Sequence, residues 1–203
     1  MDHLDEIVRR IGALDRTAGR TLVAVAGPPA SGKSTLAERL VDRLGERAIL
    51  VPMDGFHLDN IVLERRGLLA RKGAPETFDA DGFAASVRRI RTEAEVVLPA
   101  FDRARDIAVA GRVVVEPRHE VVVFEGNYLC FDAEPWRTLS EVWDLSIFLD
   151  VSEAVLLQRL VQRWLDHGLA PDAARRRAEE NDMRNARLVL RSRTSADLVL
   201  TAG

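Results

Sequence analysis

Lysine is almost absent from this chain of 203 residues: of its 29 basic residues only Lys33 and Lys72 are lysines, and the others are arginines. Lysine carries a compact, rotatable ammonium, whereas arginine presents a planar fork. In a chain with this preference for arginine, each lysine is a candidate for a site that needs the compact charge. Lys33 lies in a glycine-bounded loop that supports this interpretation, while Lys72 could equally be a chance surface residue.

Other scarcities exclude whole classes of protein. The single cysteine, Cys130, cannot form an internal disulfide, and 32 acidic residues nearly balance the basic ones, which gives a net charge of −3. This balance indicates neither nucleic acid nor an anionic membrane as a partner. There is no apolar run of membrane-spanning length, and the first residues lack the pattern of a signal peptide. We therefore expect a cytoplasmic protein with small-molecule partners, no nucleic acid and no membrane insertion; a homodimer stays open.

Residues 21–44 have the pattern of a strand, a loop and a helix. The apolar run Leu22–Ala26 leads into a loop that matches G-x-x-x-x-G-K-[ST], and the apolar residues after it recur at helical spacing up to Gly45. In this motif the backbone N–H groups cradle nucleotide phosphates, the lysine reaches the β- and γ-phosphates, and the serine hydroxyl binds Mg²⁺. The predicted ATP-binding residues are Gly27, Pro28, Pro29, Ala30, Ser31, Gly32, Lys33, Ser34 and Thr35.

Two further predicted strands end in acidic residues. Residues 48–51 lead to Asp54, and residues 121–124 lead directly to Glu125. In open parallel α/β sheets, ligands bind beyond the carboxyl ends of the strands, so we expect both carboxylates to face the same crevice as Lys33. Glu125 then matches the carboxylate that orients Mg²⁺. The alternatives are local: Asp54 as a turn residue before Gly55, and Glu125 as a cap of the next turn.

The remaining candidates lie in less regular segments. Residues 99–106 cluster Asp102, Arg103 and two more charges around a turn within an expected hairpin, where mutual ion pairing is the alternative to a binding role. Tyr128 could line a pocket or pack in the core. A predicted helix after Ser152, which could cap it, places Arg159 and Arg163 on one face. Two such arginines can bind phosphate oxygens, although a solvated helix face has the same pattern.

The motifs together resemble one family, the P-loop small-molecule kinases, and within it the group of uridine kinase, pantothenate kinase and phosphoribulokinase. The segments that carry the resemblance span nearly the whole chain: GPPASGKS, MDGFHLDN, RKGAPETFD, PAFDR, EGNYL and RLVQRW. MDGFH and RKGAPETFD are the more specific ones, and resemble bacterial pantothenate kinases and relatives labelled fructose transport system kinases. Phenylalanine stands at 56 and 101, where a uridine kinase would carry tyrosine.

The resemblance implies a three-layer α/β fold with a five-stranded parallel sheet of order 2-3-1-4-5 and a small helical lid. It implies one kinase domain over residues 1–203, with acceptor-binding insertions at about 55–118 and a lid at about 159–180. It further implies transfer of the ATP γ-phosphate to an alcohol, with Asp54 as the base that accepts the hydroxyl proton. The residues implied to face the acceptor are His57, Lys72, Arg103 and Asn127, and those implied in the lid are Arg159 and Arg163.

The combined reading is an ATP- and Mg²⁺-dependent kinase of a small metabolite. The catalytic candidates are Lys33, Asp54, Arg159 and Arg163; the acceptor candidates are His57, Lys72, Asp102, Arg103, Asn127 and Tyr128; the metal candidates are Ser34 and Glu125. A fructose-like sugar leads as acceptor, with a nucleoside or pantothenate-like alcohol as the alternative. A rival from another class is a nucleotide-dependent switch, which needs a residue to position water but no acceptor pocket.

Overall fold

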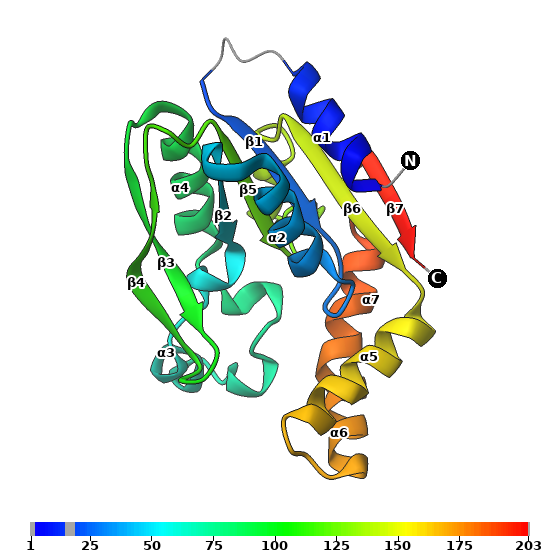
Figure 1. The fold of residues 1–203 in the computed structure, drawn as a ribbon. Coiled ribbons are helices and arrows are strands. Elements are labelled where there is room, and N and C mark those ends of the chain that lie inside the picture. Colours follow the sequence, from blue (N-terminus) through cyan, green and yellow to red (C-terminus); the bar gives the residue numbers. More distant parts are fainter. Residues whose placement is uncertain (1–2, 15–18, 203) are drawn as a thin grey trace.

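The computed structural model describes residues 3–14 and 19–202, which form three layers around a parallel sheet (Figure 1). The spatial order of its strands is β2 (Ala48–Pro52), β5 (Val121–Gly126), β1 (Thr21–Ala26), β6 (Leu145–Val151) and β7 (Leu198–Ala202). Numbered along the chain within this sheet alone, the order is 2-3-1-4-5. The predicted fold and strand order are therefore confirmed.

The alternation of side chains along each strand divides the apolar core between the two faces of the sheet. On one face, Val23 and Val25 of β1 pack with α1 (His3–Ala13) and α2 (Lys33–Leu44). On the other face, Leu22 and Ala24 join a core that includes residues of α4 (Ala80–Thr92). Both faces of the sheet are covered, which explains why β1 and β5 are apolar at nearly every position. Helix α1 ends at Ala13, and residues 15–18 lie outside the described part.

A two-stranded hairpin stands apart from the main sheet. Its strands are β3 (Val96–Asp102) and β4 (Ile107–Val115), which pair antiparallel. The strands extend further than the sequence indicates, so that residues 103–106 alone form the turn. Between β2 and this hairpin the chain forms α3 (Asn60–Arg65), short 3₁₀ turns at Met53–Phe56, Leu69–Arg71 and Pro75–Thr77, and then α4. Within the described residues, no helix combines the length and the apolar character needed to cross a membrane.

The late helices form a separate small layer beside the carboxyl ends of the strands (Figure 1). They are α5 (Glu153–Asp166), α6 (Pro171–Arg177) and α7 (Met183–Arg191), with the π-helical segment Ala178–Asp182 between the last two. A core of their own, which includes Leu156, Leu160 and Met183, holds them together. Ser152 precedes α5 as expected, but its side chain makes no capping hydrogen bond, so the predicted cap is wrong.

Candidate active site

The loop between β1 and α2 ends at Gly32, and the first side chain of α2 folds back over this loop. Gly32 has φ 93°, a left-handed conformation that favours glycine, and α2 begins at the next residue. The side chain of Lys33 bends back over the loop, where its Nζ lies 3.4 Å from the carbonyl oxygen of Pro28. This is the geometry in which a helix N-terminus and an ammonium can share one anion.

Lys33 also lies beside the carboxylate at the end of β5. Its Nζ is 3.6 Å from Oε1 of Glu125, and both side chains are at most 10% exposed. Burial raises the pKa of Glu125, while the charge of Lys33 and a hydrogen bond from Ser34 oppose that shift. The structure thus brings together the three residues expected at the phosphates and the metal.

The oxygen atoms of Ser34 and Glu125 suit Mg²⁺, which prefers oxygen ligands and keeps several waters in its shell. Within the described chain no group of three or more His, Cys, Asp or Glu residues could hold a metal. A two-residue donor set is nevertheless adequate for Mg²⁺, because substrate phosphates and water supply the remaining ligands in kinases. The residues present therefore fit this ion.

Two glycines let neighbouring segments pack closely around Asp54: Gly126 contacts Met53, and Gly55 contacts Pro99. A Cβ on Gly126 would lie 2.5 Å from the Cβ of Met53. Because Gly126 has no side chain, the turn Met53–Phe56 can pack against the end of β5. A Cβ on Gly55 would lie 2.4 Å from the carbonyl oxygen of Pro99, so the hairpin packs directly on this turn. Asp54 is held between β5 and the hairpin, near enough for its charge to raise the pKa of Glu125.

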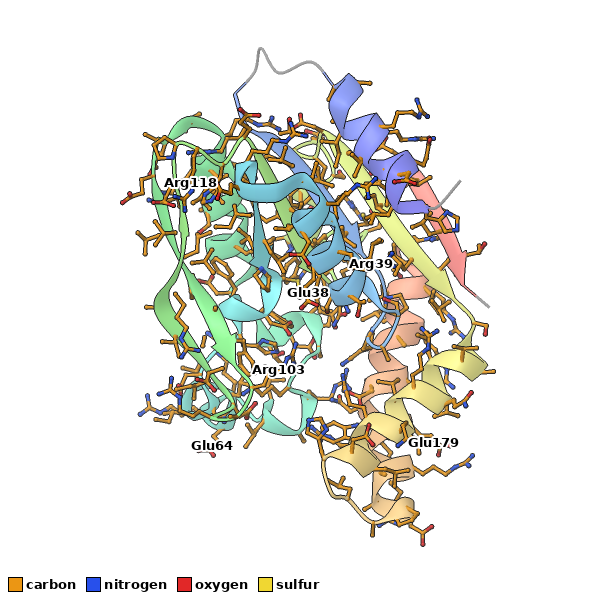
Figure 2. All side chains as sticks on the ribbon, viewed as in Figure 1. Glu38, Arg39, Glu64, Arg103, Arg118 and Glu179 are labelled. Atoms are coloured by element: carbon orange, nitrogen blue, oxygen red, sulfur yellow. The ribbon has the colours of Figure 1, made fainter. Side chains whose placement is uncertain are left out.

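The hairpin turn supplies a partner to Asp54. Arg103 donates from Nη2 to Oδ2 of Asp54 at 2.7 Å, and its side chain is 72% exposed against 23% for the aspartate. Figure 2 labels Arg103 on the part of the molecule that faces α5 and α6. The bond leaves Oδ1 of Asp54 for another donor. An exposed arginine on a hairpin tip is free to exchange this partner for a ligand.

His57 and Phe101 form the apolar part of the expected acceptor site. Their ring centroids are 4.7 Å apart, and the His57 ring also contacts Phe78 at 4.0 Å. Burial lowers the pKa of His57, against the opposing charge of Asp54. Burial thus favours the neutral imidazole, and its Nδ1 lies 2.8 Å from the carbonyl oxygen of Asp54.

Lys72 is no surface lysine. Its ammonium bonds Oδ1 of Asn60 at 2.7 Å and the carbonyl oxygen of Asp106 at 2.8 Å, pairs with the Asp106 carboxylate and lies 5.0 Å over the Phe101 ring. Its side chain is 10% exposed. Asn60 was missed from the sequence, and the only available signal was its place in the motif MDGFHLDN.

Three other acceptor candidates have different surroundings. Asp102 binds Arg105 and Arg112 on its own hairpin, which is the ion-pairing alternative. Tyr128 is fully buried, and its hydroxyl donates to the carbonyl oxygen of Gly73 at 2.6 Å. The structure thus corrects the assignment of Tyr128 as a pocket residue, because its ring packs in the core. Asn127 has a buried Oδ1 without a hydrogen-bond partner, and its contact with the acceptor stays a prediction.

The two arginines of α5 point to different partners. Arg159 donates to the carbonyl oxygens of Ala30 and Ser31 at 3.3 Å, so it reaches the phosphate loop. Arg163, one turn later, binds the Asp182 carboxylate at 3.2 Å. Asp182 was missed from the sequence because a single acidic residue within a charged helix gives no signal of its own.

This arrangement joins a phosphate-binding loop, a pair of oxygen ligands for a cation, and a carboxylate beside an enclosed polar and aromatic cluster. Phosphoryl transfer needs positioned phosphates, charge neutralisation and a group that accepts the proton of the nucleophile. The described residues place groups that are chemically suited to each of these tasks at one edge of the sheet.

The model of one protein family, Phosphoribulokinase / Uridine kinase, matches residues 22–199. A crystal structure from Silicibacter sp. TM1040, of a protein provisionally described as a fructose transport system kinase, is 53% identical in sequence and superposes with a TM-score of 0.91. The similarity covers 97% of this chain and 96% of that one.

Two relatives extend the comparison. A Schizosaccharomyces pombe protein provisionally named a uridine kinase is 35% identical over 209 residues, which covers 97% of this chain and 89% of its own length. The pantothenate kinase of Listeria welshimeri is 33% identical over 152 residues, 70% of this chain and 49% of the relative. The match therefore spans about half of that pantothenate kinase.

Proposed function

Because the chain belongs to the phosphoribulokinase / uridine kinase family, it is a kinase that uses ATP and a hydroxyl-bearing acceptor, and we propose that the acceptor is a small, fructose-like sugar. The observation that carries this proposal is the position of Asp54, at the edge of the sheet that also bears Lys33 and Glu125. The proposal includes Mg²⁺ at Ser34 and Glu125.

Different residues of this chain bind the phosphates and activate the acceptor hydroxyl. The N–H groups of the phosphate loop and the ammonium of Lys33 hold the β- and γ-phosphates, and Arg159 adds charge from α5. The hydroxyl of Ser34 and the carboxylate of Glu125 would hold Mg²⁺, which would supply charge neutralisation at the phosphates. Asp54 accepts the proton of the acceptor hydroxyl at Oδ1 and orients the oxygen for attack on the γ-phosphorus.

The side chains around Asp54 favour a sugar as the acceptor. Arg103 binds Asp54, and Lys72 and Asn60 lie beside Phe101; together these side chains carry both donors and an acceptor oxygen for hydroxyl groups. The Lys72 ammonium lies over the Phe101 ring, which leaves less of that ring for a nucleobase to stack on. The similar protein from Silicibacter is provisionally described as a fructose transport system kinase, which agrees with this choice.

A nucleoside or a pantothenate-like alcohol is the second candidate, since relatives carry those names. A nucleotide switch without an acceptor fits less well. Such a protein needs a mobile surface that changes partners on hydrolysis, whereas here the carbonyl oxygen of Asp54 contacts His57, whose ring packs on Phe78 and Phe101.

A coupled assay of ADP release against a panel of sugars, nucleosides and pantothenate tests the proposal. We expect sugars, fructose among them, to stimulate ADP release more than uridine does. Lys33→Ala is the background control, because it removes the charge at the phosphates. Stronger stimulation by uridine or pantothenate would reverse the choice of acceptor, and equal release with every compound would favour a switch.

A further inference from the structure

The π-helical segment Ala178–Asp182 lies between two parts of the molecule that handle different substrates. A π turn is wider than an α turn, and such turns occur frequently at functional sites. Here the wide turn directs two consecutive buried side chains, Asn181 and Asp182, to different partners. One of them contacts the segment 66–78, which we call the acceptor loop, and the other contacts α5.

Asn181 holds the acceptor loop through two hydrogen bonds, one to its backbone and one to a side chain. Its Nδ2 donates to the carbonyl oxygen of Lys72 at 3.1 Å, and its Oδ1 accepts from Nη1 of Arg71. The other nitrogen of the same guanidinium, Nη2, donates to Oδ1 of Asn185 at 2.8 Å. Both asparagines are at most 5% exposed. Removal of either amide takes one hydrogen-bond acceptor away from the half-buried guanidinium of Arg71, which weakens the link.

Asp182 fixes the helix on the nucleotide side. Its Oδ2 accepts from the indole Nε1 of Trp164 at 2.6 Å and from Nη2 of Arg163 at 3.2 Å. Arg159 lies one turn earlier on the same helix and reaches the phosphate loop. A nucleotide that draws Arg159 toward its phosphates therefore acts on the helix that Asp182 holds.

We propose that Asn181 and Asp182 are positioning residues that couple nucleotide binding at α5 to the geometry of the acceptor loop. The backbone between them is one peptide unit, so a shift of α5 passes to the carbonyl of Lys72 through a short, buried chain of hydrogen bonds. Lys72 is the lysine beside Phe101, and its placement decides how the acceptor is received. This inference rests on the proposed function for the role of Lys72, but the coupling itself is measurable without an acceptor.

Hydrogen exchange of the acceptor loop measures the coupling. The amides of Lys72, Ala74 and Thr77 are hydrogen-bonded within the loop, so their exchange reports its opening. We expect a non-hydrolysable ATP analogue with Mg²⁺ to slow exchange in residues 66–78 of the wild-type protein by at least about fivefold, the lower range of measured couplings between sites. In Asn181→Ala and in Asp182→Ala, which removes the acceptor of Trp164 and Arg163, the analogue should still bind but should no longer slow exchange there.

Arg175→Ala is the matched control. Arg175 pairs with Glu179, which Figure 2 labels on the lid, and the arginine side chain is 67% exposed. It neighbours the π-helical segment without contacting the acceptor loop, so the full effect of the analogue should remain. Arg71→Met breaks the same link from the loop side and replaces Asn181→Ala if that variant does not fold.

Several results would overturn the proposal. They are an unchanged effect of the analogue in Asn181→Ala or Arg71→Met, an equal loss in Arg175→Ala, and no slowing in the wild-type protein. Calorimetry on each variant separates these results from a failure of the proposed function. A wild-type protein that does not bind the analogue contradicts the kinase itself, whereas a protein that binds it without slowing exchange contradicts only the coupling.

Discussion

Replacement of Asp54 by asparagine tests the base most directly, because it keeps the shape of the side chain and removes its basicity. A general base contributes about 10²–10⁴-fold to the rate, which corresponds to roughly 2.7–5.4 kcal/mol of activation free energy. The structure predicts little loss of stability. The ion pair with Arg103 is largely exposed on the arginine side, where such pairs contribute about 1 kcal/mol or less, and the asparagine oxygen can still accept from the guanidinium.

The assay has two parts. Calorimetry should give an affinity of Asp54→Asn for Mg-ATP within a few-fold of wild type, and steady-state kinetics with the best acceptor should give a kcat lower by at least about 10²-fold. Asp102→Asn is the comparison, since Asp102 binds Arg105 and Arg112 and should be dispensable for proton transfer. A collapse of ATP affinity with high residual kcat in Asp54→Asn would refute the reasoning. Asp54 would then bind the metal or shape the loop, and the base would be sought at Asp102 or Glu125.

Four further expectations follow from the site. Lys33→Ala should abolish transfer and weaken Mg-ATP binding, and an unchanged turnover rate would contradict the kinase mechanism. Arg159→Ala should lower kcat far more than the melting temperature, because an exposed arginine contributes little stability; parallel losses in both measurements would make Arg159 structural. Lys72→Arg should raise the KM of the acceptor although charge is kept, since a planar guanidinium does not fit the contacts of the ammonium, and a wild-type KM would mean that charge alone suffices. Cys130 is 3% exposed and burial raises the pKa of its thiol to about 12, so a thiol reagent should label it only after unfolding; rapid labelling of the native protein would show that the site opens.

The fold and the convergence of Lys33, Ser34 and Glu125 could be predicted because their signals are local. The phosphate loop is a continuous motif, and β1 and β5 are apolar runs that a sheet covered on both faces requires. Acidic residues at two strand ends converge because parallel strands end at the same edge. Each of these inferences needs only a short continuous segment of sequence and the rule that parallel strands end at the same edge of a sheet.

The surroundings of the proposed acceptor residues could be predicted only in part, because their contacts join segments that are distant in the chain. The bond from Arg103 to Asp54 crosses 49 positions, and that from Arg71 to Asn185 crosses 114. A sequence pattern also does not show whether a side chain is buried. Tyr128 follows a strand whose end carries Glu125, yet its ring is fully buried in the core. Gly55 reads as a turn residue in the sequence, whereas the structure requires it for the close approach of the hairpin.

The scarcity of lysine proved more informative than the charge motifs. Lys33 and Lys72 have side chains that are 10% exposed, while every arginine in the ion pairs of the described residues is more exposed, from 23% for Arg91 upward. Both lysines lie within 4 Å of a carboxylate, Lys33 over the loop before α2 and Lys72 beside Phe101. An ammonium has three rotatable donors and no planar fork, so it can satisfy several oxygens in a small space and still turn toward a substrate. This chain otherwise uses arginine for surface charge. Lys33 and Lys72 therefore stand at the two positions where a positive charge lies in a small, nearly buried space beside oxygen atoms.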